Sequence, residues 1–393
     1  KILTGGGESP VTLIPAEIVK NQSLNVDSVS GATITSAAIK AAVKKCLEQA
    51  GAKAGDWNTA PKAAAAPADT SADVVVVGGG GAGLAAAIAA GQQNASVIIV
   101  EKNGEVGGDT LVCGAIYNTP DEPLQSKVTM TNAVKTTVEK ALAEKPINAD
   151  HAALQAEVQK QWNAYKKSGR KDLFDTKEWY ALQTWNGGDK VGKLNLVKVL
   201  CYNAFDDLDW IESLGMKFNT IIGQGAGSLW QRTHTSTMQM GTGFISTYVE
   251  NLDKLPNVKV MVETTGKSLV KDASGKITGV VCADKKGNQF TISAKDGVIL
   301  ATGGFAANSK MVQQYNTSGK WSDLSKVATT NRSGCSQGDG IAMAVEAGAS
   351  LTDMNEIQLL YLGNIQDGQL TKYPPRDVNG TDQIIFINKE GKR

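Results

Sequence analysis

Three glycines near residue 80 have the spacing of a phosphate-binding turn. Gly78, Gly80 and Gly83 form the pattern G-x-G-x-x-G directly after four consecutive valines, and an alanine-rich helix is predicted to follow from Leu84. The first glycine of such a pattern permits a tight turn, the second lets backbone N–H groups approach a pyrophosphate, and the third lets helix and strand pack closely. The positive end of the helix dipole also attracts phosphate. The pattern therefore favours a dinucleotide.

An acidic residue follows at the distance expected for a ribose contact. Residues 96–100 are predicted to form a second buried strand, which ends in Glu101. This is close to the offset of about 20 residues at which an acid binds a ribose 2′-OH. The glycines alone would also fit an ordinary turn between strand and helix. Strand, helix and acid together predict a dinucleotide site, and NAD and FAD both remain candidates on these residues.

A second candidate site lies in the first 50 residues. The segment from Asp27 to Thr33, DSVSGAT, leads into a helix that Gly51 is expected to end. A loop of small residues leaves the Thr33 hydroxyl accessible for covalent chemistry. The alternative is that the hydroxyl groups only cap the helix, through Thr35 or Ser36.

The composition excludes several classes of function. The 393 residues carry 40 basic and 39 acidic side chains, a net charge of +1, so the chain lacks an electrostatic footprint for nucleic acid or anionic lipid. No apolar run is long enough to span a bilayer. The five cysteines are scattered and form no C-x-x-C pair, so neither a disulfide framework nor a metal site is expected.

The order of predicted elements indicates an α/β fold in several parts. Residues 1–50 form a small α+β unit, and the Ala- and Pro-rich residues 51–72 are interpreted as a linker, which acts either as a docking tether or as a passive spacer. Residues 73–356 form a Rossmann-like domain with a mostly helical insert at about 120–215. Residues 357–393 begin a further domain.

Several details of the Rossmann-like domain concern its core. An antiparallel excursion is predicted at about 257–295, followed by a second buried strand from residue 297. His151 is expected at the surface of the helical insert. The helix predicted at 194–214 carries an apolar stripe expected to face the core, namely Leu194, Val197, Leu200, Cys201, Ala204, Leu208 and Ile211.

Four motifs in order resemble the flavoprotein family of fumarate reductase and succinate dehydrogenase. After the first glycine motif with Glu101 come GGDT at 107–110, ATGGF at 301–305 and GDG at 338–340. The resemblance covers residues 73–393 and implies an FAD-binding domain, followed by the start of a substrate-capping domain. It also implies FAD rather than NAD, with contacts from Gly78, Gly80, Ala82, Gly83, Glu101, Lys102, Gly108, Asp109, Thr110, Gly114, Ala115, Thr302, Gly303 and Asp339.

The segment before Thr33 resembles the flavinylation motif of FMN-binding domains. In these domains a flavin transferase joins the phosphate of FMN to the threonine hydroxyl. The resemblance implies an incomplete FMN-binding domain in residues 1–50, with FMN as a covalent phosphoester at Thr33.

The substrate side distinguishes members of the family. After Gln358, where fumarate reductases carry a His-Pro-Thr segment, this chain has LLYLGN, and YPPRD follows at 373–377. Tyr361 and Asp377 are similar to residues of the urocanate reductases. An aspartate repels a dicarboxylate and accepts a hydrogen bond from imidazole. The alternative is that Tyr361 is an ordinary aromatic residue at a domain boundary and Asp377 a turn residue.

The resemblance implies a flavin-dependent ene-reductase that passes electrons from FMN to FAD and on to the C=C bond of an unsaturated carboxylate, with urocanate favoured. A reductase of fumarate, acrylate or aryl acrylate stays open, as does an electron-transfer flavoprotein without its own small substrate. The implied partners are an external donor, such as a cytochrome or reduced carrier, and a flavin transferase, in a periplasmic or other extracytoplasmic location.

Two expectations concern the arginines and the second histidine. Arg232 and His234 form an Arg-x-His segment that family members often place beside the flavin or substrate. The family's proton donor, an arginine, would lie a few residues beyond Arg393. The chain starts without Met, and residues 386–393 resemble a strand and a hairpin turn without a return strand, so we expect an internal fragment of a longer protein.

Overall fold

The computed structural model describes residues 9–29, 32–57, 67–225, 228–327, 329, 331–359, 364–366, 369–371 and 390–392. The chain divides into two compact units, Lys1–Ala301 and Thr302–Arg393. Tyr361 and Asp377, the two substrate residues expected from the sequence, lie outside the described residues.

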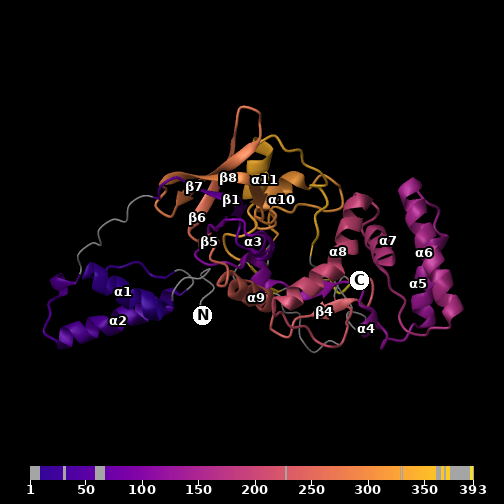
Figure 1. Ribbon diagram of the computed structural model, residues 1–393, viewed down its shortest axis with the longest axis horizontal. Helices are drawn as coiled ribbons and strands as arrows, with labels where there is room; N and C mark the ends of the chain where they lie inside the picture. Colours follow the sequence, from indigo (N-terminus) through magenta and orange to yellow (C-terminus); the bar gives the residue numbers. More distant parts are fainter. Residues whose placement is uncertain are drawn as a thin grey trace. The chain divides into compact units, whose positions relative to one another are not determined.

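A six-stranded sheet lies at the centre of the first unit, in the order β5-β2-β1-β8-β7-β6 (Figure 1). The first four of these strands are parallel, whereas β7 and β6 extend the sheet in antiparallel pairing. This confirms the predicted antiparallel excursion for β6, β7 and the start of β8, but not for β5, which was predicted to belong to it and instead pairs in parallel with β2. The strands are β1 (Thr70–Val77), β2 (Val97–Val100), β5 (Val258–Met261), β6 (Thr264–Lys271), β7 (Ile277–Asp284) and β8 (Gln289–Leu300).

Helix α3 (Gly81–Gln92) follows β1 and packs on the parallel part of the sheet, and α9 (Thr242–Leu252) packs against α3. Val75 and Val76 are fully buried, as the valine run predicts. The prediction of a buried second strand from residue 297 is wrong in one respect. These residues are the end of β8, but Ile299 remains 38% exposed. An apolar run alone does not reveal whether a second layer covers its outer side.

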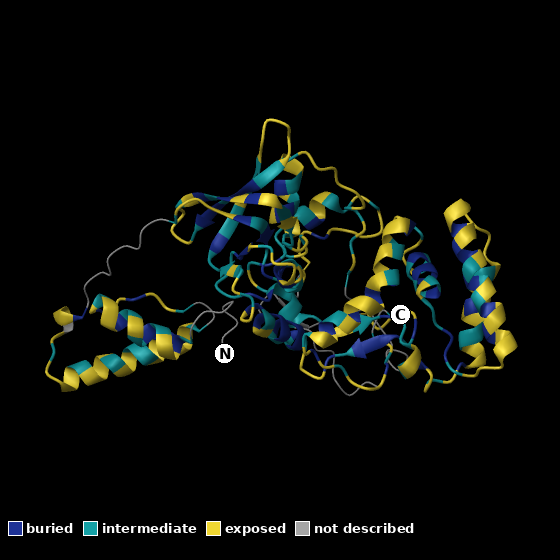
Figure 2. Ribbon diagram, in the orientation of Figure 1, coloured by how far each residue is buried: buried dark blue, intermediate teal, exposed yellow. Residues whose placement is uncertain are grey.

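The helical insert contains five helices, of which α5 to α8 enclose an aromatic core and leave their outer faces exposed (Figure 2). Trp162, Trp179 and Trp185 are each at most 4% exposed. The expectation that His151 lies at the surface is wrong: it is fully buried and meets the Trp185 ring edge-on at 5.0 Å. The helices are α4 (Glu122–Gln125), α5 (Asn132–Ala143), α6 (Ala149–Ser168), α7 (Lys177–Gly187) and α8 (Leu194–Ser213).

The apolar stripe of α8 is largely confirmed, because Cys201, Ala204, Leu208 and Ile211 are buried. Leu200 is the exception, with 61% of its surface exposed. The helix carries apolar residues on two faces, and only packing against α7 selects the inner one.

The N-terminal residues form a small module of their own. Helices α1 (Pro10–Asn21) and α2 (Thr33–Gln49) enclose a core that includes Ile14 and Ile18. The short turn η1 (Ala54–Asp56) leads to Trp57, which is 5% exposed and whose carbonyl oxygen accepts a hydrogen bond from the Leu24 N–H at 2.8 Å. Trp57, which falls in the stretch interpreted as a linker, is therefore hydrogen-bonded to this module.

The remaining described elements are short. A two-stranded ribbon pairs β3 (Ile116–Asn118) with β4 (Thr233–Thr235). The second unit contains α10 (Ser309–Tyr315), α11 (Asp339–Glu346), β9 (Asn364–Gln366) and β10 (Gln369–Thr371).

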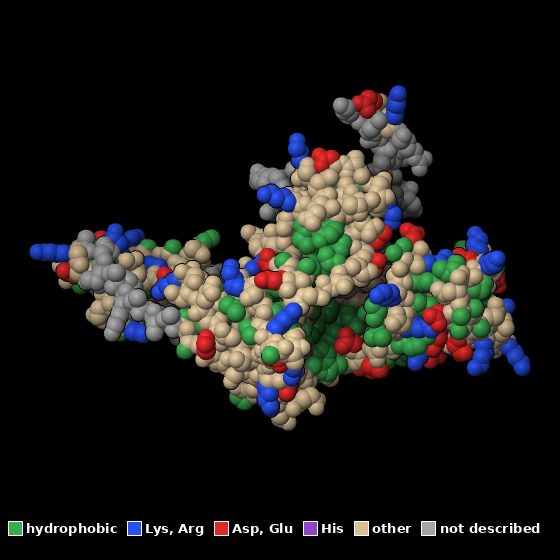
Figure 3. All heavy atoms as spheres, turned by 90° about the horizontal axis from the view of Figure 1, so that it is seen from above, with side chains coloured by type: hydrophobic (Ala, Val, Ile, Leu, Met, Phe, Trp, Pro, Cys, Tyr) green, Lys and Arg blue, Asp and Glu red, His purple; other side chains and the backbone are tan. Residues whose placement is uncertain are grey.

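The surface carries charges of both signs. Figure 3 shows Lys and Arg interspersed with Asp and Glu, in keeping with the net charge of +1. Within the described part of the chain, no helix combines the length and the apolar character needed to cross a bilayer.

Candidate functional site

The glycine turn between β1 and α3 has the predicted geometry. Gly78 has a φ of +108°, in the region that favours glycine. A Cβ on Gly83 would lie 1.9 Å from the Gly78 carbonyl oxygen, so helix and strand touch there. A Cβ on Gly80 would meet no atom within 4 Å, and no side chain caps α3. The second glycine thus faces open space at a helix N-terminus, as a pyrophosphate requires. Ala82, one residue into the helix, is exposed.

Glu101 is held rigidly beside this turn. The side chain is 6% exposed; its Oε2 accepts from the Gly79 N–H and its Oε1 from the Asn103 N–H, both at 2.8 Å. A carboxylate has about four acceptor sites, so these bonds leave capacity for a ribose hydroxyl. Lys102, the next predicted contact, is half-buried. The ribose acceptor of the predicted site is therefore preorganised by backbone amides.

The GGDT segment packs directly onto the glycine turn. The Gly107 N–H donates to the Gly79 carbonyl oxygen at 2.7 Å, and the Gly81 N–H donates to Thr110 Oγ1 at 3.1 Å. Gly108 has a φ of +47° and opens the short helix η2 (Gly108–Val112), which contains Asp109. Two motifs that are separate in the sequence therefore form one continuous cradle.

Gly241 is part of this cradle but was not expected from the sequence. It precedes α9, and a Cβ on it would lie 1.6 Å from the Thr110 carbonyl oxygen. The two glycines of the segment Gly241-Thr-Gly243, immediately before an apolar helix, were the available signal. Gly241 therefore fixes how closely α9 approaches the GGDT turn.

The segment after η2 leads into the β3–β4 ribbon. Gly114 is exposed, whereas Ala115 is buried with a φ of +55°, and its carbonyl oxygen accepts from the Ser236 N–H at 3.0 Å. Across the ribbon, His234 is 2% exposed; its Nε2 lies 3.1 Å from Asp121 Oδ2 and its Nδ1 3.3 Å from the Tyr117 carbonyl oxygen. The imidazole thus has a protein partner on each side.

Arg232 links the ribbon to the helical insert. Its guanidinium donates twice to Asp175, at 2.8 and 2.9 Å, and lies 4.3 Å from the centre of the Tyr180 ring. Gln125 donates to the same carboxylate at 2.7 Å. Burial raises the pKa of the Asp175 carboxyl, and the pairing with Arg232 opposes that rise. In the structure, both members of the Arg-x-His segment are bound to the scaffold, and their predicted place beside flavin or substrate stays a prediction.

The later motifs come together in the second unit. The Gly338 N–H donates to the Gly304 carbonyl oxygen at 3.0 Å, and a Cβ on Gly340 would lie 1.9 Å from Thr302 Oγ1. Gly303 is exposed with a φ of +74°, and Asp339 is exposed as the first residue of α11. The ATGGF and GDG motifs therefore meet at the start of this helix, and their contact with FAD stays a prediction.

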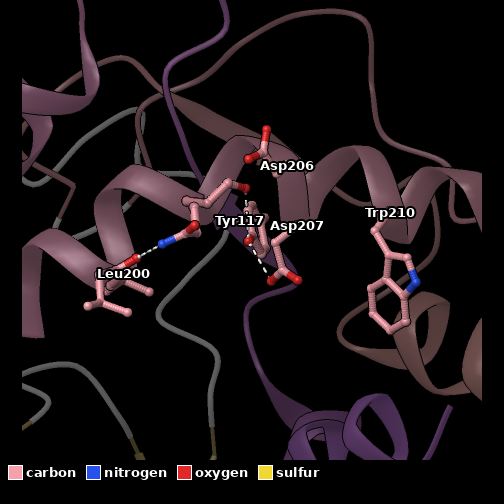
Figure 4. Close-up of a pocket in the computed structure, with 8 residues that line it drawn as sticks. Tyr117, Leu200, Asp206, Asp207 and Trp210 are labelled. Atoms are coloured by element: carbon pink, nitrogen blue, oxygen red, sulfur yellow. Dashed lines mark hydrogen bonds between the residues drawn. The ribbon is translucent and has the colours of Figure 1, made fainter. Parts of the chain in front are cut away.

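A groove of about 450 Å³ runs along the exposed face of α8 and contains none of the predicted site residues (Figure 4). It is lined by Leu200 and Trp210, with Asp206 and Asp207 beside them. At its side the Tyr117 hydroxyl donates to Asp207 at 3.0 Å, and burial followed by the charge of Asp207 raises the pKa of the tyrosine.

Four parallel strands, a glycine-rich turn with its acidic partner and a second glycine turn packed on the first define a dinucleotide-binding fold. Residues 73–165 and 163–369 match the family described as FAD binding domain, and the chain belongs to this oxidoreductase family of FAD-binding proteins. Residues 3–48 match the FMN-binding domain. The chain thus contains binding domains for both flavins. The open space at Gly80 and the fixed Glu101 carboxylate fit FAD.

The curated relatives are reductases. The chain is 30% identical to NADH:acrylate oxidoreductase of Vibrio harveyi over 97% of this chain and 39% of that protein. It is 32% identical to urocanate reductase of Eggerthella lenta over 99% of this chain and 57% of that protein. The open conformation of a flavocytochrome c3 fumarate reductase superposes with a TM-score of 0.56 and 25% identity, over 74% of this chain and 42% of that one. The chain thus spans between 39% and 57% of the length of these proteins.

Proposed function

We propose that this chain is the FMN- and FAD-binding part of a reductase that saturates the C=C bond of a 2-enoate. The proposal rests above all on the cradle formed by the glycine turn, Glu101 and the GGDT segment, together with relatives named as acrylate, urocanate and fumarate reductases. Bound FAD supplies a hydride for the carbon β to the electron-withdrawing group.

The residues of this chain hold and orient that flavin. The N-terminus of α3 faces the pyrophosphate, and Glu101 accepts from the adenosine ribose. By the resemblance, Thr110 and Asp109 would hold the side of the isoalloxazine ring, and Asp339 would bind the ribityl chain. Because backbone amides hold the side chains of Glu101 and Thr110, these two groups would orient the flavin without reorganising when substrate arrives.

FMN carried on Thr33 would supply the electrons to FAD. Thr33 is exposed at the start of α2, so a flavin transferase can reach its hydroxyl. An external cytochrome or reduced carrier supplies the electrons, and the protein works outside the cytoplasmic membrane.

Urocanate is the proposed substrate. In this chain Leu359 and Leu360 follow Gln358, at the position of the His-Pro-Thr segment of fumarate reductases. Tyr361 and Asp377 instead offer a hydroxyl and a carboxylate to an imidazole ring. Acrylate and fumarate are the alternatives that the relatives favour.

The test is anaerobic reoxidation of the full-length protein. The flavins are reduced chemically, and urocanate, acrylate and fumarate are added separately while flavin absorbance is followed. We expect rapid reoxidation by urocanate and slow reoxidation by fumarate. Reoxidation by none of the three would overturn the reductase proposal in favour of an electron-transfer flavoprotein, and preference for acrylate or fumarate would overturn the substrate assignment.

A further inference from the structure

A buried serine ties the first turn of α2 to the loop before it. Ser36 is fully buried; its hydroxyl accepts from the Val29 N–H at 3.0 Å and donates to the Ala32 carbonyl oxygen at 2.9 Å. Capping of the helix by Thr35 or Ser36 was the alternative considered from the sequence. Neither side chain makes a capping hydrogen bond at the N-terminus of α2. Instead, the Ser36 hydroxyl is hydrogen-bonded to the backbone of Val29 and of Ala32, and Ala32 immediately precedes Thr33.

A lysine one turn further along α2 holds the beginning of the same loop. The Lys40 ammonium donates to the Val26 carbonyl oxygen and, at 3.3 Å, to Ser28 Oγ. Val26 is itself 6% exposed and packs with Ile14 and Ile18 in the core of the module. The segment before α2 is therefore bonded to α2 at Val26 and Ser28, through Lys40, and at Val29 and Ala32, through Ser36. Val26 also packs in the core.

Thr33 lies at the end of this held loop. It is the first residue of α2 and exposed, and the N-cap residue Ala32 provides no side-chain cap. The first-turn N–H groups of a helix have no intrahelical acceptor, and they favour an anion. A phosphodiester on Thr33 would place its negative charge at this helix end.

We propose that Ser36 is a positioning residue for flavin attachment, an inference that rests on the proposed covalent FMN at Thr33. In that reaction Thr33 Oγ forms a bond to the FMN phosphorus of an FAD donor. The pyrophosphate bond breaks, AMP leaves, and the hydroxyl proton passes to a base of the transferase. Ser36 touches neither reactant. It holds Val29 and Ala32 so that the Thr33 hydroxyl has one orientation on the helix end.

The experiment measures the rate of flavin attachment in the full-length protein. Protein expressed without a flavin transferase is incubated with purified transferase and FAD. Covalent flavin is followed by in-gel fluorescence and intact mass. In Ser36→Ala the loop loses its hydroxyl clamp, and we expect the rate at saturating FAD and transferase to fall on the order of tenfold to a hundredfold. Ser36→Thr keeps the hydroxyl and should restore most of the rate.

Two controls separate positioning from simple stability. Thr35→Ala removes an exposed neighbouring hydroxyl and should label like the wild type. Ile18→Val weakens the same core by about 0.5–1.5 kcal/mol without touching the loop, and it should also label at the wild-type rate. Thermal unfolding and circular dichroism of each variant report its folding. If Ser36→Ala fails to fold, Lys40→Met removes the second clamp and should slow labelling in the same direction.

The outcomes are distinct. Labelling of Ser36→Ala at the wild-type rate overturns the inference, as does equal slowing in Ile18→Val. If Ser36→Ala does not fold, wild-type labelling of Lys40→Met overturns it. Absence of labelling in the wild type, or labelling of Thr33→Ala, instead overturns the proposed FMN attachment at Thr33.

Discussion

The flavin cradle and the helical insert lie in the same unit but are held together in opposite ways. Backbone atoms build the cradle: amides of Gly79, Gly81 and Gly107 make its bonds, and Gly83 has no room for a methyl group. The insert is built by large side chains, with tryptophans in its core and a buried ion pair at its edge. Adding an atom should therefore destabilise the cradle most, whereas removing an interaction should destabilise the insert most.

The largest effect is expected from an added methyl group in the cradle. Gly83→Ala places Cβ 1.9 Å from the Gly78 carbonyl oxygen, which cannot move without separating α3 from β1. We expect a loss of more than about 4 kcal/mol in the free energy of unfolding, seen as failure to accumulate folded, FAD-containing protein.

Two matched glycines test whether the clash is the cause. Gly80→Ala meets no protein atom, so it should fold but bind FAD weakly, because its methyl group occupies the space of the pyrophosphate. Gly297→Ala, also in open space, should keep both fold and FAD. A stable Gly83→Ala protein with full FAD content would contradict this account of the cradle.

The next largest effect is expected from a lost charge in the insert. Asp175→Asn leaves the Arg232 guanidinium buried at 3% side-chain exposure without its counter-charge. Breaking such a pair costs about 3 kcal/mol or more, measured by urea unfolding. Asp172→Asn is the control in the same insert, because its partner Arg170 is 43% exposed and the pair should contribute less than about 1 kcal/mol. Equal losses in the two variants would argue against the buried pair as the anchor.

The smallest effect concerns His151 and pH. Burial lowers the pKa of this imidazole, and the Lys190 charge adds to that while Glu144 opposes it. The folded state then keeps His151 neutral while the unfolded chain takes up a proton below the ordinary pKa of 6.5. As the pH decreases below that value, the free energy of unfolding should decrease by at most about 1.4 kcal/mol per pH unit. Above pH 6.5 the imidazole is neutral in both states, so the stability is not reduced by its protonation.

His151→Phe isolates this contribution, since phenylalanine keeps an aromatic ring against Trp185 and cannot be protonated. Urea unfolding between pH 8 and pH 5 should show a shallower decline for the variant than for the wild type. Identical slopes would mean that the buried imidazole does not contribute to the pH dependence.

The cradle and the helical insert also differ in how well the sequence predicted them. The turn from Gly78 to Gly83 and its acidic partner Glu101 were predicted from local spacing and from the backbone angles that only glycine adopts easily. The GGDT positions at 107–110 were expected only from the resemblance to a flavoprotein family. The helices of the insert were also predicted, but His151 was wrongly placed at the surface. Its helix is polar on most faces, and Trp185, which buries it, is 34 residues away in the sequence.

The sequence by itself determined where the chain turns, where strands and helices begin, and which family of flavin proteins it belongs to. These properties depend on residues a few positions apart. Only the tertiary structure decided that Gly241 closes onto Thr110, that Asp175 meets Arg232, and that Ser36 holds a loop instead of capping a helix. The contacts of Gly241 and of Asp175 join positions far apart in the sequence, so they exist only once packing has brought the segments together. The Ser36 contacts are local, but spacing alone does not distinguish them from a cap.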